Sequence, residues 1–117
     1  EGGKHFTNVA PQIGLTVPGR SARQTSWVDI DNDGDLDLHA ANRTGPNSLY
    51  RNDGGTFALI ADKAIADPRP TVGACWLDYD RDGDLDLFLA NQSGATDALL
   101  RNDGGAFVDV ALQLGMD

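Results

Sequence analysis

The sequence predicts an all-β fold of two four-stranded antiparallel sheets plus an extra N-terminal strand. A segment of about fifty residues occurs twice, and each copy contains a strong hairpin turn signal. Glu1 is the only glutamate among the 18 acidic residues, and aspartate favours turns over helix interiors. With 117 residues, 40% of them hydrophobic, the chain can form one domain with a modest core.

The repeat is visible in two aligned blocks. WVDIDNDGDLDLHAAN at residues 27–42 matches WLDYDRDGDLDLFLAN at residues 76–91, which lies 49 residues later. LYRNDGGTF at residues 49–57 matches LLRNDGGAF at residues 99–107, which lies 50 residues later. One residue is therefore inserted between the blocks, in a segment whose Gly, Ser, Thr and Asn content predicts a loop.

A third, partial copy opens the chain, because residues 2–15 resemble residues 104–116. We therefore divide the sequence into a partial repeat, which supplies the terminal strand of a preceding or neighbouring unit, and two full repeats. The predicted boundaries are 1–20, 21–68 and 69–117. A period near fifty residues is too long for a solenoid turn and suits a propeller-like blade of four short strands.

Each repeat divides into two linked hairpins. The first strands are expected near 24–30 and 73–79, the second near 36–41 and 85–90, the third end at Arg51 and Arg101, and the fourth begin at Phe57 and Phe107. Between the third and fourth strands, Asn-Asp-Gly-Gly supplies residues that tolerate positive φ, as a tight hairpin requires.

The apolar pattern predicts which side chains are buried. Strand 85–90 alternates leucines on one face with Phe88 on the other, so both faces should be covered. His39 stands where the second repeat has Phe88, which predicts a wetter face in the first repeat. Cys75 has apolar neighbours and is predicted to be a buried small residue rather than a reactive thiol.

Two aspartate-rich loops, 29–37 and 78–86, carry the chemistry. Each has aspartate at positions 1, 3, 5, 7 and 9 and glycine at position 6. Side chains at positions 1, 3 and 5 can converge on one ion, position 7 offers its carbonyl, and the side chain at position 9 closes the site. The predicted ligands of the two Ca²⁺ sites are Asp29, Asp31, Asp33, Asp35 and Asp37, and Asp78, Asp80, Asp82, Asp84 and Asp86.

Hard oxygen donors in a flexible loop favour Ca²⁺ over Mg²⁺, and Zn²⁺ would require His or Cys. An EF-hand would need a glutamate at position 12, where this chain has Ala40 and Leu89. A solvated acidic turn is the simpler alternative, but chance would not keep five aspartates and a glycine in register twice.

The loop pattern D-x-D-x-D-G-x-x-D followed by Leu, with N-x-L-Y-x-N-x-G-G-x-F downstream, resembles the VCBS/FG-GAP repeat over nearly the whole chain. The repeats are similar to those of bacterial relatives of cartilage acidic protein, and integrin α-subunit propellers share the calcium loop. The resemblance implies a calcium-stabilised propeller, usually seven-bladed, that lies outside the cytoplasm.

These features predict a structural or adhesion module of an extracellular or cell-surface (secreted or periplasmic) protein. Its expected partners are copies of itself, stacked head to tail, or further blades of the same propeller. A net charge of −9 argues against nucleic acid, and no apolar run is long enough for membrane insertion. No enzyme is expected, because the ion accounts for the repeated carboxylates.

The alternative function is carbohydrate binding, since aromatic side chains could stack on sugars. The candidates are Trp27, Trp76, Tyr50 and Tyr79, whose simpler role is packing in the core or at strand edges. Asn42 and Asn91 are formal N-glycosylation acceptors, or structural asparagines that cap the second strand of each repeat.

Overall fold

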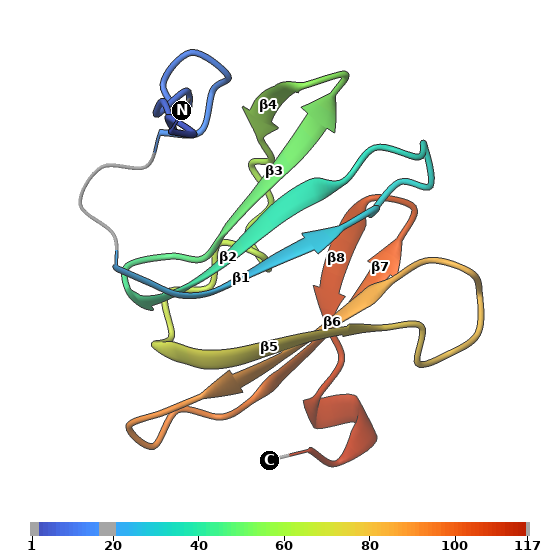
Figure 1. Cartoon of the computed structure of the whole chain (residues 1–117). Helices are drawn as coiled ribbons and strands as arrows, with labels where there is room; N and C mark the ends of the chain where they lie inside the picture. The colour runs from blue at the N-terminus through green and yellow to red at the C-terminus, as the bar shows by residue number, and fades with distance from the viewer. Residues whose placement is uncertain (1–2, 17–20, 117) are drawn as a thin grey trace.

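The computed structural model describes residues 3–16 and 21–116, and it contains two four-stranded antiparallel sheets (Figure 1). Sheet 1 has the order β1-β2-β3-β4 and sheet 2 the order β5-β6-β7-β8, so neighbours in sequence are neighbours in space. The strands are β1 (Ser21–Val28), β2 (Asp37–Thr44), β3 (Ser48–Asp53), β4 (Thr56–Leu59), β5 (Thr71–Leu77), β6 (Asp86–Asn91), β7 (Ala98–Asp103) and β8 (Ala106–Asp109). The all-β prediction of two antiparallel sheets is confirmed, and each sheet lies within one predicted repeat, whose boundaries stay a prediction.

The third and fourth strands of each sheet meet at the predicted glycine turns. Gly54 and Gly55 have φ of +63° and +97°, and Gly104 and Gly105 have φ of +65° and +95°. Two successive residues with positive φ form the turn whose twist matches that of the flanking strands. Side chains other than glycine rarely adopt these angles, so the local sequence determines where each hairpin turns.

The predicted extra N-terminal strand is wrong for the residues that the structure describes. Residues 3–16 contain no strand, and residues 10–14 form a turn in which Asn8 Oδ1 accepts a hydrogen bond from Ala10 N at 3.1 Å. The equivalents of this segment, β4 and β8, each pair with a third strand, and both of those positions are already taken. Residues 1–2 and 17–20 of the predicted partial repeat lie outside the described residues.

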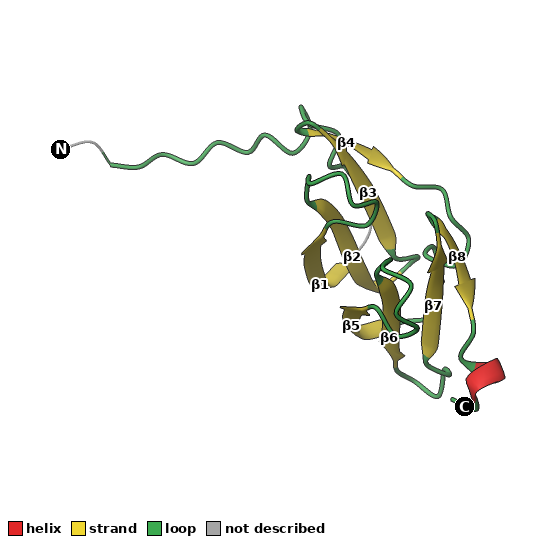
Figure 2. Ribbon diagram, turned by 90° about the vertical axis from the view of Figure 1, so that its right-hand side faces the viewer, coloured by secondary structure: helices red, strands yellow, loops and turns green. Residues whose placement is uncertain are grey.

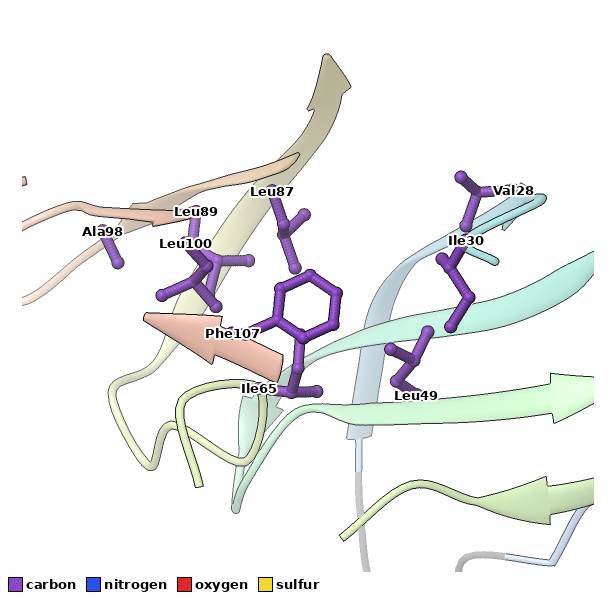
Figure 3. Close-up of a cluster of buried hydrophobic side chains, with 9 residues drawn as sticks. All are labelled: Val28, Ile30, Leu49, Ile65, Leu87, Leu89, Ala98, Leu100 and Phe107. Atoms are coloured by element: carbon purple, nitrogen blue, oxygen red, sulfur yellow. The ribbon is translucent and has the colours of Figure 1, made fainter. Parts of the chain in front are cut away.

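The core lies between the two sheets. Side chains from both sheets converge there with Ile30 from the first acidic loop and Ile65 from the connection between the sheets (Figure 3). The buried cluster consists of Val28, Ile30, Leu49, Ile65, Leu87, Leu89, Ala98, Leu100 and Phe107. Burying one such large apolar side chain contributes about 1.5–3 kcal/mol, so the sheets stabilise each other.

Polar contacts fix how the two sheets are placed. Gln24 on β1 donates from Nε2 to the carbonyl of Ala74 at 2.7 Å and accepts from the Ala74 amide at 2.9 Å. Asn47 Nδ2 donates to Thr71 Oγ1 at 2.9 Å in a buried position. Because these bonds have directional requirements that apolar contacts lack, they select one register between the sheets.

Two burial predictions are wrong. His39 is fully buried, whereas the sequence predicted a more solvent-exposed face in the first repeat. Sheet 2 covers this face and places Trp76 edge-on to His39 at a centroid distance of 5.6 Å. Cys75 is exposed rather than buried. It lies on edge strand β5 and points to the opposite face from its neighbours Ala74 and Trp76, which pack on the core.

Candidate metal centres

The two acidic loops join the first and second strands of each sheet and turn sharply at position 6. Gly34 and Gly83 have φ of +95° and +98°, so this position suits glycine. Asn32 and Arg81 at position 4 are also left-handed, with φ of +59° and +65°. The sequence pattern predicted the turn at glycine but not the second left-handed residue before it.

Carboxylate oxygens cluster in both loops. In the first loop, oxygens of Asp29, Asp31 and Asp37 all lie within 4.8 Å of one another. In the second loop, the corresponding group is Asp78, Asp80 and Asp82. Such all-oxygen donor sets are the ligands that Ca²⁺ prefers, so the chemistry of both groups fits that ion.

The aspartates at position 3 of both loops have raised pKa values. Partial loss of water raises the pKa of Asp31, and the nearby charges of Asp33 and Asp37 raise it further. The pKa of Asp80 is raised in the same way, by desolvation first and then by Asp82 and the other loop carboxylates. Each raised pKa indicates repulsion that a bound cation would relieve.

The aspartate at position 1 of each loop accepts hydrogen bonds from backbone amides at positions 5 and 6 of the same loop. Asp29 accepts hydrogen bonds from the amides of Asp33 at 3.2 Å and Gly34 at 3.0 Å. Asp78 accepts from the amides of Asp82 at 3.1 Å and Gly83 at 3.2 Å. The short aspartate side chain can reach backbone amides a few residues later, as it commonly does in turns. These side-chain to backbone hydrogen bonds therefore help to hold the shape of each loop.

Position 9 anchors each loop to the sheet. Asp37 is fully buried, and its two oxygens accept from the amides of Ile30 at 2.9 Å and Asn52 at 2.7 Å. Asp86 is equally buried and accepts from the amides of Tyr79 at 3.0 Å and Asn102 at 2.9 Å. These carboxylates tie the start of the loop to the third strand, a role that the sequence did not reveal.

The remaining predicted ligands lie in the same loops but outside the two clusters. Asp33 Oδ1 accepts from the Asp35 amide at 2.8 Å, and Asp35 Oδ2 accepts from the Gly54 amide at 3.1 Å. Asp84 Oδ1 accepts from Asn32 Nδ2 at 3.3 Å, a contact that joins the two loops. The complete ligand set at positions 1, 3, 5, 7 and 9 stays a prediction.

Two asparagines support the loops from the third strands. Asn52 Nδ2 donates to the carbonyl of Leu36 at 3.0 Å. The fully buried Asn102 donates from Nδ2 to Leu85 at 3.2 Å and to Ile30 at 3.4 Å, so it contacts the backbone of both loops. From the sequence both residues are expected only in the hairpin turns, although their identical place in the two repeats is a usable signal.

The aromatic candidates for sugar stacking mostly pack inside the protein. Trp76 lies edge-on to Phe107 at 6.1 Å as well as to His39, and Tyr50 is 3% exposed. Trp27 is 56% exposed and lies edge-on to Phe57 at 6.0 Å.

The two formal glycosylation sites make structural hydrogen bonds. The Asn42 amide group donates from Nδ2 to the carbonyl of Pro46 at 2.7 Å, and its backbone amide donates to Asn47 Oδ1 at 2.7 Å. Asn91 Nδ2 donates to the carbonyl of Thr96 at 2.9 Å. These contacts favour the interpretation that both asparagines cap the end of the second strand.

Comparison with known proteins places these loops in a family. None of the curated proteins compared with the chain matches it. Within residues 3–16 and 21–116, no helix is long and apolar enough to cross a membrane. The model of the FG-GAP-like repeat family matches residues 29–89, which is more than half of the chain and includes both acidic loops. The chain therefore belongs to the FG-GAP-like repeat family.

Proposed function

We propose that this chain is a non-enzymatic, calcium-binding structural module: two blades of a propeller-type or head-to-tail array that acts in adhesion or as a scaffold outside the cytoplasm. FG-GAP-like repeats are generally structural modules, often bind calcium and are typically extracellular. The proposed partners are further blades of the same propeller or copies of this chain. The family match gives no support to the carbohydrate-binding alternative.

The observation that carries this proposal is the paired acidic clusters. Both loops extend from the same end of the two sheets (Figure 1). Asn32 Nδ2 of the first loop donates to Asp84 Oδ1 of the second at 3.3 Å. Several like charges held this close destabilise a loop unless a cation neutralises them. Bound Ca²⁺ would supply that neutralisation, while the residues around it hold the first and second strands of each sheet together.

The test is a calcium titration of the chain by calorimetry, together with thermal melting in calcium and in chelator. We expect two ions per chain and a melting temperature that rises with calcium, because an ion that binds only the folded state stabilises it. Replacing Asp31 and Asp80 by Asn together should weaken binding at both loops. Asp103→Asn, an exposed aspartate outside the loops, is the matched control and should bind calcium normally. Equal melting temperatures in calcium and in chelator would refute the proposal.

A further inference from the structure

A buried set of hydrogen bonds connects the two acidic loops. In the first loop, the Ile30 amide donates to Asp37 Oδ2 at 2.9 Å. The Ile30 carbonyl accepts from Asn102 Nδ2 at 3.4 Å, and the Asn102 amide donates to Asp86 Oδ1 of the second loop at 2.9 Å. The aspartates at position 9 of the two loops are therefore joined through two residues. We call these contacts, from Asp37 through Ile30 and Asn102 to Asp86, the bridge.

The bridge is shielded from water. Asp37, Asn102 and Asp86 are fully buried, and Ile30 is 5% exposed. The Ile30 side chain packs in the core cluster with residues of sheet 2, so its backbone has little freedom to move alone. A buried polar group that loses its partner has no water to replace it. Displacement of one member of the bridge therefore constrains the next.

The equivalent asparagine of the first repeat serves as an internal comparison. Asn52 Nδ2 donates to the carbonyl of Leu36 in its own loop at 3.0 Å, as Asn102 Nδ2 does to Leu85 at 3.2 Å. Both asparagines also accept a hydrogen bond from the second glycine of their own hairpin, at 2.7 Å. Among the described residues, the hydrogen bonds of Asn52 stay within the first repeat. The contact with Ile30 is therefore what distinguishes Asn102 from its counterpart.

A second contact joins the loops at the surface, between Asn32 at position 4 of the first loop and Asp84 at position 7 of the second. In Figure 2 the end of the sheets that carries both loops faces the viewer. In this view the loops lie between the N-terminal segment and the 3₁₀ helix η1 (Leu112–Leu114). The two loops thus meet both inside the protein and at its surface.

The two carboxylate clusters differ in whether they include position 9. Asp37 belongs to the first cluster, whereas the second consists of Asp78, Asp80 and Asp82, and Asp86 lies outside it. The first site therefore already has its closing carboxylate in place, and the second must still bring in Asp86. Since the bridge ends at Asp86, ordering of the first loop reaches the residue that the second cluster lacks.

We propose that Asn102 couples the two calcium sites, so that calcium binding at the first loop, which fills first, raises the affinity of the second. This inference rests on the calcium binding proposed above and concerns how the two sites act together. Asn102 is a positioning residue, because its side chain contacts the backbone of the loops and of its hairpin.

The direction of the coupling follows from conformational freedom. Ion binding orders the first loop, and the bridge then holds part of the second loop in place, so the second binding event loses less conformational entropy. Such coupling is reciprocal and typically changes affinity by about 5–150-fold. Repulsion between two bound cations acts in the opposite direction. Tighter binding at the second site is therefore the specific signature of the bridge.

The first experiment is a calorimetric calcium titration of the native chain, Asp31→Asn and Asp80→Asn. Each variant weakens one loop, so the other loop fills alone. The product of the two native dissociation constants should be about fivefold or more smaller than the product of the constants of the two remaining single sites. Asp53→Asn and Asp103→Asn remove an exposed charge outside the loops and should leave the native constants unchanged. Equal products would show independent sites and overturn the proposal.

The second experiment repeats this cycle in chains that carry Asn102→Ala or Asn52→Ala. Both substitutions remove a hydrogen bond to the adjacent loop and one to the hairpin, but Asn102→Ala alone also removes the contact with Ile30. Asn102→Ala should make the two products equal, whereas Asn52→Ala should keep the fivefold difference. If Asn102→Ala weakened both sites but kept the difference, Asn102 would have only a structural role.

A third measurement leaves Asn102 in place, so it applies even if Asn102→Ala does not fold. In Asp80→Asn, calcium fills the first loop, and hydrogen exchange is compared with that in chelator. The amides of Tyr79 and Asn102, which donate to Asp86, should slow more than the amide of Val110, which donates to Leu99 at the start of β7. Equal slowing of all three amides would overturn the proposal.

The two proposals fail in different ways. If the native chain binds two ions with independent constants, calcium binding stands and the coupling through Asn102 is wrong. If the chain binds no calcium, both the proposed function and this inference are wrong.

Discussion

His39 is the residue whose environment differs most from its sequence context. It is fully buried against Trp76, and neither ring nitrogen has a hydrogen-bond partner among the described residues. Burial lowers its pKa from 6.5 to about 4, so the folded protein holds the neutral ring. A buried polar group without partners costs roughly 1–3 kcal/mol.

Replacing His39 by Phe, the residue at the equivalent position 88, should raise the free energy of unfolding by about 1 kcal/mol at pH 7. The gain should grow as the pH falls from 6.5 towards 4, because the unfolded state then takes up a proton at His39 that the folded state refuses. Urea unfolding in calcium at pH 7.5 and pH 5.5 measures both effects. His5→Phe, at an exposed position, is the control, and an equal pH slope for native and His39→Phe would contradict the assignment.

At the scale of the element, each acidic loop has two kinds of aspartate. Asp37 is buried and accepts two backbone amides, so the fold needs it whether or not an ion is bound. Asp31 is exposed, and its pKa is raised by partial loss of water and then by its acidic neighbours, so without a cation it is a source of repulsion. The same spacing pattern therefore contains a candidate ligand that also anchors the loop, Asp37, and one that does not, Asp31, and the sequence cannot distinguish them.

Unfolding measurements in chelator distinguish the anchoring role of Asp37 from the proposed ligand role of Asp31. In chelator, Asp37→Asn should lower the free energy of unfolding by about 2 kcal/mol, because one of two charge-assisted hydrogen bonds is lost. Asp31→Asn should change it little in chelator but should weaken calcium binding. Denaturant titrations with and without calcium test this contrast, and Asp86→Asn with Asp80→Asn repeats it in the second loop. Similar losses for both variants in chelator would show that Asp31 also anchors the loop.

At the scale of the whole molecule, the two sheets form one unit through a shared core and a small number of directed polar contacts. Gln24 is central to these, since it pairs with both backbone groups of Ala74 on the edge strand of sheet 2. Strand β5 would otherwise leave these groups partly buried and without protein partners. The contact therefore positions sheet 2 as well as stabilising it.

Gln24→Ala should lower the free energy of unfolding by about 1–3 kcal/mol, because two hydrogen bonds are lost and the Ala74 groups remain. Hydrogen exchange should show the largest loss of protection in β1 and β5. Arg23→Ala is the neighbouring control: its exposed contact with Gln92 is 3.5 Å long, and its removal should cost less than about 0.5 kcal/mol. If the two variants lost the same stability, Gln24 would not be the residue that joins the sheets.

The sequence by itself determined the parts of this protein that depend on local chemistry. The glycine pairs at 54–55 and 104–105 require positive φ, so they place both hairpins. The alternating aspartates and the glycine at position 6 fix the loops, and the internal repeat fixes their number. Each of these signals lies within a short stretch of sequence or recurs in both repeats. They can therefore be recognised without knowing which other segments pack nearby.

Only the tertiary structure decided which faces are covered. His39 is buried and Cys75 is exposed because of where the second sheet lies, and residues 3–16 form no strand because no third strand is free to pair with them. The two roles within the aspartate loop likewise depend on the third strand, which supplies the amides of Asn52 and Asn102. Side-chain burial and strand pairing depend on segments that are distant in sequence and meet only in the folded protein. A local sequence pattern therefore identifies candidate core and ligand residues, and the packing determines the role of each.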